Sequence, residues 1–170
     1  TELLLVGPIA PGPSLAEFGD RVRRRGFQPW DRLYGQLATV DVNLAPLVLP
    51  SAFNEAKSAI KWLEAAAVGV PTVASASRPF VDAIDDGRTG VLCGSPDDWY
   101  DAVTALVDDP ERRRRLGRMA RRRVEVAHGP HVPALAHLDA LDELADRRAP
   151  RRSSWSDRAP DERAPSAPPL

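Results

Sequence analysis

Short apolar runs alternate along the chain with stretches in which apolar residues recur every three or four positions. The apolar runs are typical of buried strands, and the longer spacing is typical of helices that pack one face on a core. The predicted strands are residues 3–6, 21–25, 40–45, 72–74 and 90–93. The predicted helices are a short one ending near residue 18, then 29–38, 56–68, 79–84, 96–107, 110–127 and 131–146.

This alternation favours an α/β fold with a Rossmann-like parallel sheet flanked by helices. Because ligands bind such sheets at the carboxyl ends of the strands, we expect a site among the loops that follow Val6, Ala45 and Ala74. We assign residues 1–146 to this domain. Residues 147–170, in which Pro, Arg and Ser dominate without periodicity, are predicted to form a disordered tail.

The predicted helix 56–68 carries a polar stripe. At 100° per residue, Lys57, Lys61 and Glu64 fall within about 60° of one another, over a length of about 10 Å. A diphosphate with its attached ribose has a similar length. The neighbouring apolar stripe, which we expect to face the core, consists of Ala56, Ile60, Leu63 and Ala67.

The two lysines of this stripe are the only lysines in the chain. Two cations four positions apart repel each other, and the start of a helix disfavours positive charge. A bound anion would remove both conflicts, since helix N-termini offer N–H groups to phosphates and lysines add charge-assisted hydrogen bonds. The oxygens of Glu64 suit a vicinal diol such as a ribose. The alternative is that Lys61 and Glu64 form an ordinary ion pair on a solvated helix face.

Several segments then resemble one family in the order in which they occur. They are Asp41–Leu47, Phe53–Ser58, Lys61–Ala67, Gly69–Ser75, Asp86–Leu92, Trp99, Asp109–Pro110 and Leu116–Gly117. Together, over about residues 3–127, they are similar to family 4 retaining glycosyltransferases of the GT-B fold. The resemblance implies the C-terminal half of a two-domain enzyme, which binds a nucleotide-sugar donor and needs neither a metal nor a cofactor.

The resemblance also implies roles for individual residues. Glu64 matches the glutamate that holds the donor ribose, and Lys61 matches a basic residue at the diphosphate, so these two are the implied catalytic residues. The family's first acidic residue would fall on Ala56, and Glu55 is the candidate substitute one position earlier. The full donor-binding set is Phe27 and Gln28 near the nucleobase, with Glu55, Lys57, Ser58, Ala59, Ile60, Lys61 and Glu64.

The function implied is transfer of a hexose from a nucleoside-diphosphate sugar to a glycan, lipid or polysaccharide precursor. In the family, a domain that precedes this region binds the acceptor, so we expect the chain to be a fragment that lacks this domain and the N-terminal edge of the donor domain. Two alternatives stay open. The chain is a non-catalytic nucleotide-sugar-binding or interaction module, or it is an epimerase of the same architecture.

Composition narrows the partners and the location. The net charge of −1 gives no indication of binding to nucleic acid or to an anionic membrane, and the single cysteine, Cys93, is compatible with a reducing, cytoplasmic compartment. The arginines at 112–115 and 121–123 leave peripheral contact with the inner face of a membrane open, with a solvated surface as the alternative. The three histidines lack partners at ligand spacing, so no metal site is predicted.

Overall fold

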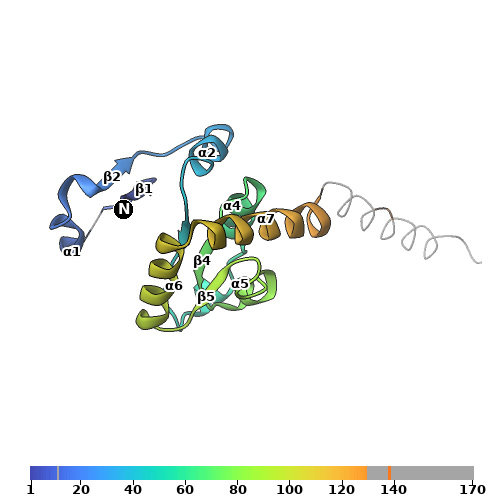
Figure 1. Cartoon of the computed structure of the whole chain (residues 1–170). Helices are drawn as coiled ribbons and strands as arrows, with labels where there is room; N and C mark the ends of the chain where they lie inside the picture. Colours follow the sequence, from blue (N-terminus) through green and yellow to red (C-terminus); the bar gives the residue numbers. More distant parts are fainter. Residues whose placement is uncertain (11, 130–137, 139–170) are drawn as a thin grey trace, which may run out of the picture. The chain divides into compact units, whose positions relative to one another are not determined.

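The computed structural model describes residues 1–10, 12–129 and 138, and Thr1–Gly129 form one compact unit. Two parallel sheets lie in this unit (Figure 1). One pairs β1 (Leu3–Val6) with β2 (Val22–Arg25), and the other has the order β3 (Asn43–Ala45), β4 (Thr72–Ser75), β5 (Val91–Cys93). The helices are α1 (Pro13–Ala16), α2 (Trp30–Leu37), α3 (Ala52–Glu55), α4 (Ile60–Ala67), α5 (Arg78–Ala83), α6 (Pro96–Asp108) and α7 (Pro110–Ala127), with a 3-10 turn at Gly19–Arg21.

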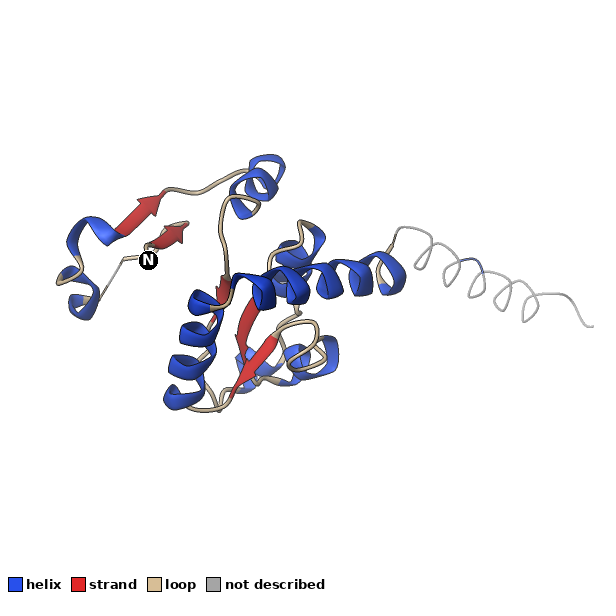
Figure 2. Ribbon diagram, in the orientation of Figure 1, coloured by secondary structure: helices blue, strands red, loops and turns tan. Residues whose placement is uncertain are grey.

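Helices cover both faces of the three-stranded sheet, as Figure 2 shows. Val73 of β4 packs with Leu106 of α6, whereas the next residue, Ala74, packs with residues of α4 and α5 on the opposite face. Consecutive strand residues point to opposite faces, so a strand with helices on both sides is apolar throughout. The predicted α/β fold with parallel sheets flanked by helices is therefore confirmed.

Helix α7 joins the two faces, because Leu116 belongs to one apolar cluster and Ala120 to the other. Between them, Gly117 approaches the turn that ends α4. A Cβ atom placed on Gly117 would lie 1.9 Å from the carbonyl oxygen of Gly69, so only glycine fits there. Gly69 itself has a φ of 77°, the left-handed conformation expected after a helix C-terminus.

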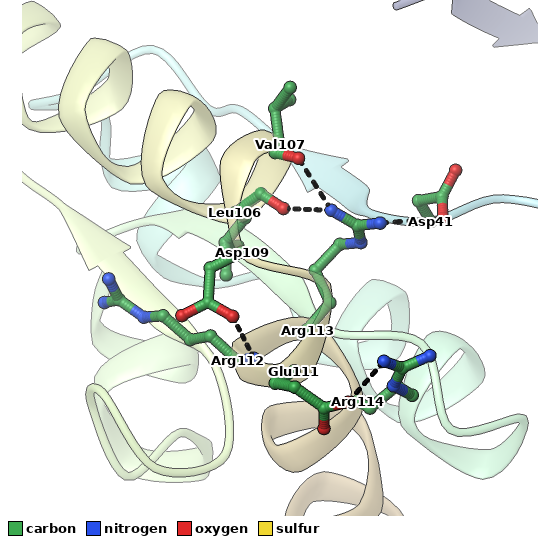
Figure 3. Close-up of polar contacts among 8 residues, drawn as sticks. All are labelled: Asp41, Leu106, Val107, Asp109, Glu111, Arg112, Arg113 and Arg114. Carbon is green, nitrogen blue, oxygen red and sulfur yellow. Dashed lines mark hydrogen bonds and ion pairs between the residues drawn. The ribbon is translucent and has the colours of Figure 1, made fainter.

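The junction between α6 and α7 is closed by an inward-pointing arginine (Figure 3). Arg113 donates to the carbonyl oxygens of Leu106 and Val107 at the end of α6, the latter at 2.9 Å, and forms an ion pair of 3.5 Å with Asp41. The carboxylate of Asp109 accepts a hydrogen bond from the backbone N–H of Arg112 and so caps α7. The last carbonyls of α6 and the first amides of α7 are thereby satisfied within the fold.

The prediction of a single helix over 56–68 is wrong in its first turn. A separate helix, α3, forms between the predicted strand 40–45 and α4 because Ser51 caps it, and residues 56–59 then turn before α4 begins at Ile60. The face of α4 that packs on the core also differs from the prediction, since Ile60 is 46% exposed. Its buried residues are Trp62, Ala65 and Ala66.

Trp62 explains this orientation of α4. Its indole is fully buried, and Nε1 donates to the carbonyl oxygen of Thr89 at 2.9 Å. A tryptophan contributes the largest apolar surface of the helix and also brings a donor that must be satisfied, so it selects the inward face. The predicted helix 131–146, apart from residue 138, and the predicted tail 147–170 lie outside the described residues, so the boundary at residue 146 stays a prediction.

Candidate functional site

The segment between β3 and α4 is held in place by side-chain hydrogen bonds. The hydroxyl of Ser75, at the end of β4, accepts from the N–H of Leu47 at 2.8 Å and donates to its carbonyl at 3.1 Å. The amide of Asn54 donates to the carbonyl of Val48 at 2.8 Å. Because this segment starts at the carboxyl end of β3, these contacts fix how the chain enters α4 at the edge of the sheet where parallel α/β folds bind ligands.

The N-terminus of α4 has no capping side chain. Helices α3, α6 and α7 begin with capping residues Ser51, Ser95 and Asp109, whereas α4, which begins after Ala59, has no side-chain cap, and neither have α1, α2 and α5. Within the described residues, no hydrogen bond reaches the backbone N–H groups of residues 58–61. Four unsatisfied donors at a helix N-terminus, together with the helix dipole, attract an anion.

Lys57 and Lys61 are on either side of this start. Lys57 lies in the turn before α4, with its Nζ 4.8 Å from the centroid of the Phe53 ring, and Lys61 lies in the first turn of the helix. The prediction that both lysines share one straight helix face with Glu64 is therefore wrong for Lys57. What the structure keeps is that both lysines are exposed and lie next to the uncapped amides in the sequence.

Lys61 and Glu64 form an ion pair of 3.4 Å, as one reading of the sequence predicted. The two side chains differ in exposure, at 63% for Lys61 and 18% for Glu64, so the carboxylate is held against the protein while the ammonium group extends into solvent. Asn43 of β3 links α4 to the sheet, because its amide donates to the carbonyl of Lys61 and to the hydroxyl of Thr72 in β4. Exposed pairs of this kind contribute at most about 1 kcal/mol, so a stronger ligand can compete for Lys61.

Glu55 has a structural partner that the sequence does not reveal. Its Oε2 accepts a hydrogen bond of 2.7 Å from the backbone N–H of Arg78, the first residue of α5. The side chain of the preceding Ser77 is fully buried, and its Oγ has no hydrogen-bond partner within the described residues, so it does not cap this helix. Glu55 therefore links α3 to the start of α5, and its predicted contact with the donor stays a prediction.

Phe27 and Gln28 lie in the loop between β2 and α2. The Phe27 side chain is 79% exposed, and the Gln28 amide donates to the carbonyls of Gly26 and Phe27 within the same loop. An exposed aromatic ring can stack on a nucleobase, but nothing in this geometry tests the predicted position near one.

A second feature at the carboxyl edge of the sheet is a hollow of about 550 Å³. Cys93, at the end of β5, contributes to its wall. Burial, and then the negative charges of Asp98 and Asp86, raise the pKa of this thiol from 9.0 to about 11, so it is protonated at neutral pH. Other lining residues include Leu47, Val48, Ser75, Gly94 and Trp99.

Among the described residues, no helix is both long enough and apolar enough to cross a membrane.

Sequence relatives of the chain are named glycosyltransferases. The D-inositol 3-phosphate glycosyltransferase of Corynebacterium kroppenstedtii is 30% identical over 164 residues, which are 92% of this chain and 36% of that protein. The protein of the same name from Paenarthrobacter aurescens is 35% identical over 108 residues, 62% of this chain and 26% of that protein. The chain thus spans about a third of the length of the first relative and about a quarter of the second.

Two solved structures show the same fold. Sucrose-phosphate synthase from Thermosynechococcus elongatus superposes with a TM-score of 0.68 at 24% identity, covering 86% of this chain and 39% of that one. HepE from Anabaena, in complex with UDP-glucose, gives a TM-score of 0.61 at 16% identity, covering 80% and 40%. The family described as "Glycosyl transferases group 1" matches residues 1–109. The chain therefore belongs to the group 1 glycosyl transferases.

Proposed function

We propose that the chain binds the nucleoside-diphosphate-sugar donor of a glycosyltransferase, with the diphosphate at the start of α4. The observation that carries this proposal is the uncapped N-terminus of α4, whose unsatisfied amides at residues 58–61 lie beside Lys57 and Lys61. A diphosphate accepts hydrogen bonds from several amides at once, and two ammonium groups balance its charge. The neighbouring helices α3, α6 and α7 already have their own caps.

The two lysines at the start of α4 have a catalytic role in this proposal, because they stabilise the leaving group. When the bond between the sugar and the diphosphate breaks, negative charge develops on the diphosphate, and cations that are already in place stabilise it. Lys57 and Lys61 perform this role together with the amides of Ser58, Ala59 and Ile60. Because the lysines supply the positive charge, the proposed site requires no metal ion.

Glu64 takes the ribose in this proposal. Its carboxylate is largely buried and fixed near Lys61, so it can accept hydrogen bonds from two neighbouring hydroxyl groups without losing much conformational freedom. On binding, Lys61 exchanges an exposed ion pair for a charge-assisted bond to the diphosphate, which contributes about 1.5–3 kcal/mol when well formed. Phe27 and Gln28 are assigned to the nucleobase, and Glu55 is assigned both to the support of α5 and to a contact with the sugar.

The finer assignments concern the reaction type and the acceptor. We propose a retaining, hexose-transferring activity of family 4, with the acceptor bound by a preceding domain. HepE, which shares the fold, was solved with UDP-glucose, and this supports a nucleotide-sugar donor. The names of the sequence relatives make D-inositol 3-phosphate the first acceptor to test, ahead of glycan and lipid acceptors.

The test is thermal unfolding of the chain with UDP, GDP, ADP and dTDP in turn, each at millimolar concentration with and without EDTA. A ligand present at 100 times its dissociation constant adds about 2.7 kcal/mol to the free energy of unfolding, which raises the melting temperature by several degrees. We expect one nucleotide to give this shift, with no dependence on EDTA.

Three variants locate the effect. Lys61→Met and Glu64→Gln are expected to weaken nucleotide binding at least tenfold, the size of one lost charge-assisted bond. Arg21→Met, which removes an exposed cation from the 3-10 turn before β2, serves as the charge-matched control and should bind as the unchanged chain does. The proposal is overturned if a cooperatively folded sample shows no shift with any nucleotide, or if all three variants bind equally.

A further inference from the structure

Helix α7 carries eight arginines in its 18 residues, and six of them fall into two groups of three. The first group has partners within the fold. Arg113 points inward to the end of α6, and Arg114 and Arg121 pair with Glu111 and Glu125 of the same helix. These arginines stabilise α7 and its junction with α6.

The second group forms a stripe along the side of α7 that lies opposite its buried face. Arg115, Arg118 and Arg122 are spaced by three and four positions, so they project from one face, and each is exposed. The other face of the helix is buried through Leu116 and Ala120. Within the described part of the chain, none of the three stripe arginines forms an ion pair. We call these three residues the arginine stripe.

A shallow hollow borders the arginine stripe near the end of α7. Its volume is about 240 Å³, and its wall includes Arg122 and Arg123 from α7 and Arg88 from the turn before β5. One carboxylate, that of Asp85, lies in the same wall and pairs with Arg88 at 3.5 Å. Guanidinium groups from two separate elements therefore face one small space, where positive charge exceeds negative charge.

We propose that the arginine stripe and this hollow bind the surface of an anionic phospholipid bilayer, with a phosphate headgroup in the hollow. Guanidinium groups bind phosphates with two parallel hydrogen bonds, and arginines near an anionic leaflet gain attraction from its surface potential. Contact is through one outward line of side chains about 16 Å long, from Arg115 to Val126 at 1.5 Å per residue, so α7 lies along the bilayer surface without crossing the bilayer. This inference does not depend on the proposed donor site.

A lipid surface fits these residues better than a nucleic acid does. Met119 lies in the wall of the hollow beside Val126, whose side chain is 68% exposed, and such apolar groups suit the boundary between headgroups and acyl chains. Helix α7 contains no aromatic residue on which a base could stack.

The experiment is co-sedimentation of the full 170-residue chain with vesicles of phosphatidylcholine alone or with 30% phosphatidylglycerol, at low and high salt. We expect binding only to the anionic vesicles, and its loss at high salt. The variant with Arg115→Gln, Arg118→Gln and Arg122→Gln should bind on the order of a hundred-fold more weakly, from about five-fold for each arginine. Since all three side chains are exposed, its thermal unfolding should match that of the unchanged chain.

A matched variant separates a local effect from net charge. Arg21→Gln, Arg25→Gln and Arg32→Gln remove the same charge from exposed positions outside α7, and this variant should bind the anionic vesicles as the unchanged chain does. The proposal is overturned if the unchanged chain ignores anionic vesicles, or if the two triple variants lose binding equally. Tighter binding to a 20-mer DNA duplex than to the vesicles would also overturn it.

Discussion

The contact between Gly117 and Gly69 predicts a large loss of stability from a single methyl group. In Gly117→Ala, the new Cβ would lie 1.9 Å from the carbonyl oxygen of Gly69 and 2.8 Å from its carbonyl carbon, both of them backbone atoms. Contacts below 3.0 Å at a Cβ are not tolerated, so α7 must move away from the end of α4 by more than 1 Å. The neighbouring Leu116 and Ala120, which are almost fully buried, would move with it.

The size of the effect follows from this displacement. Overpacking of a core costs about 1–3 kcal/mol and exceeds this range where the backbone has to shift. Because both apolar clusters are opened, we expect about 3 kcal/mol, which lowers the melting temperature by about 10 °C in a domain of this size. The measurement is thermal unfolding followed by circular dichroism.

A second glycine, Gly35, provides a control in which the same substitution should raise the stability instead of lowering it. Gly35 lies inside α2, and a Cβ there would meet no atom within 4 Å. Gly35→Ala should therefore raise the free energy of unfolding by roughly 0.5–1 kcal/mol, because alanine loses less backbone entropy in a helix. A Gly117→Ala protein that melts at or above the temperature of the unchanged chain would refute the close approach of α7 to α4.

Two further predictions concern Glu55 and Cys93. Glu55→Ala removes the hydrogen-bond acceptor of the Arg78 backbone N–H and should lower the free energy of unfolding in urea by about 1 kcal/mol. The control Glu17→Ala, at an exposed glutamate, should cause no measurable change. Equal urea midpoints for the two variants would contradict this role of Glu55. Because the pKa of Cys93 is raised on folding, the thiol of the unfolded chain ionises at a lower pH than that of the folded chain. The buried thiol therefore contributes fully to the free energy of unfolding below pH 9.0, and this contribution is lost as the pH rises to about 11. Cys93→Ala should remove this part of the pH dependence, and the native thiol should react with a disulfide reagent at pH 8 only after unfolding in urea; rapid reaction of the folded chain would contradict the burial.

The strands could be predicted from the sequence because their signal is local. The predicted strands 3–6 and 72–74 are short, mostly apolar and bounded by glycine, proline or polar residues, and no distant contact is needed to recognise them. The same holds for α7, whose bounds at Pro110 and Ala127 agree with the prediction, because Asp109 and Pro110 mark a helix start directly.

The start of α4 could not be predicted in this way. The apolar and polar spacing of residues 56–59 suits a helix, but Ser51 starts a short helix earlier, and the side chain of Asn54 bonds to Val48. Those contacts set the direction in which the chain enters α4 and override the local pattern. The inward face of α4 likewise depends on a hydrogen bond from Trp62 to Thr89, which is 27 residues away.

The candidate site shows the same division. Lys61 and Glu64 were identified from their spacing, and their ion pair is confirmed, because a separation of three within one helix fixes their proximity. The bond from Glu55 to Arg78 and the support of Lys61 by Asn43 join segments that are 23 and 18 residues apart. Polar residues within otherwise buried strands, such as Asn43 and Ser75, are the signal that could have pointed to these supporting contacts.

The central claim is that the uncapped start of α4 binds a diphosphate, and it is tested most directly by titrating pyrophosphate into the isotopically labelled chain and recording backbone amide shifts. The account predicts saturable shifts that are largest at Ser58, Ala59, Ile60 and Lys61, and that disappear in Lys61→Met. Shifts that are largest at Arg88, Arg122 and Arg123, or that are absent from residues 58–61 at saturation, would contradict it.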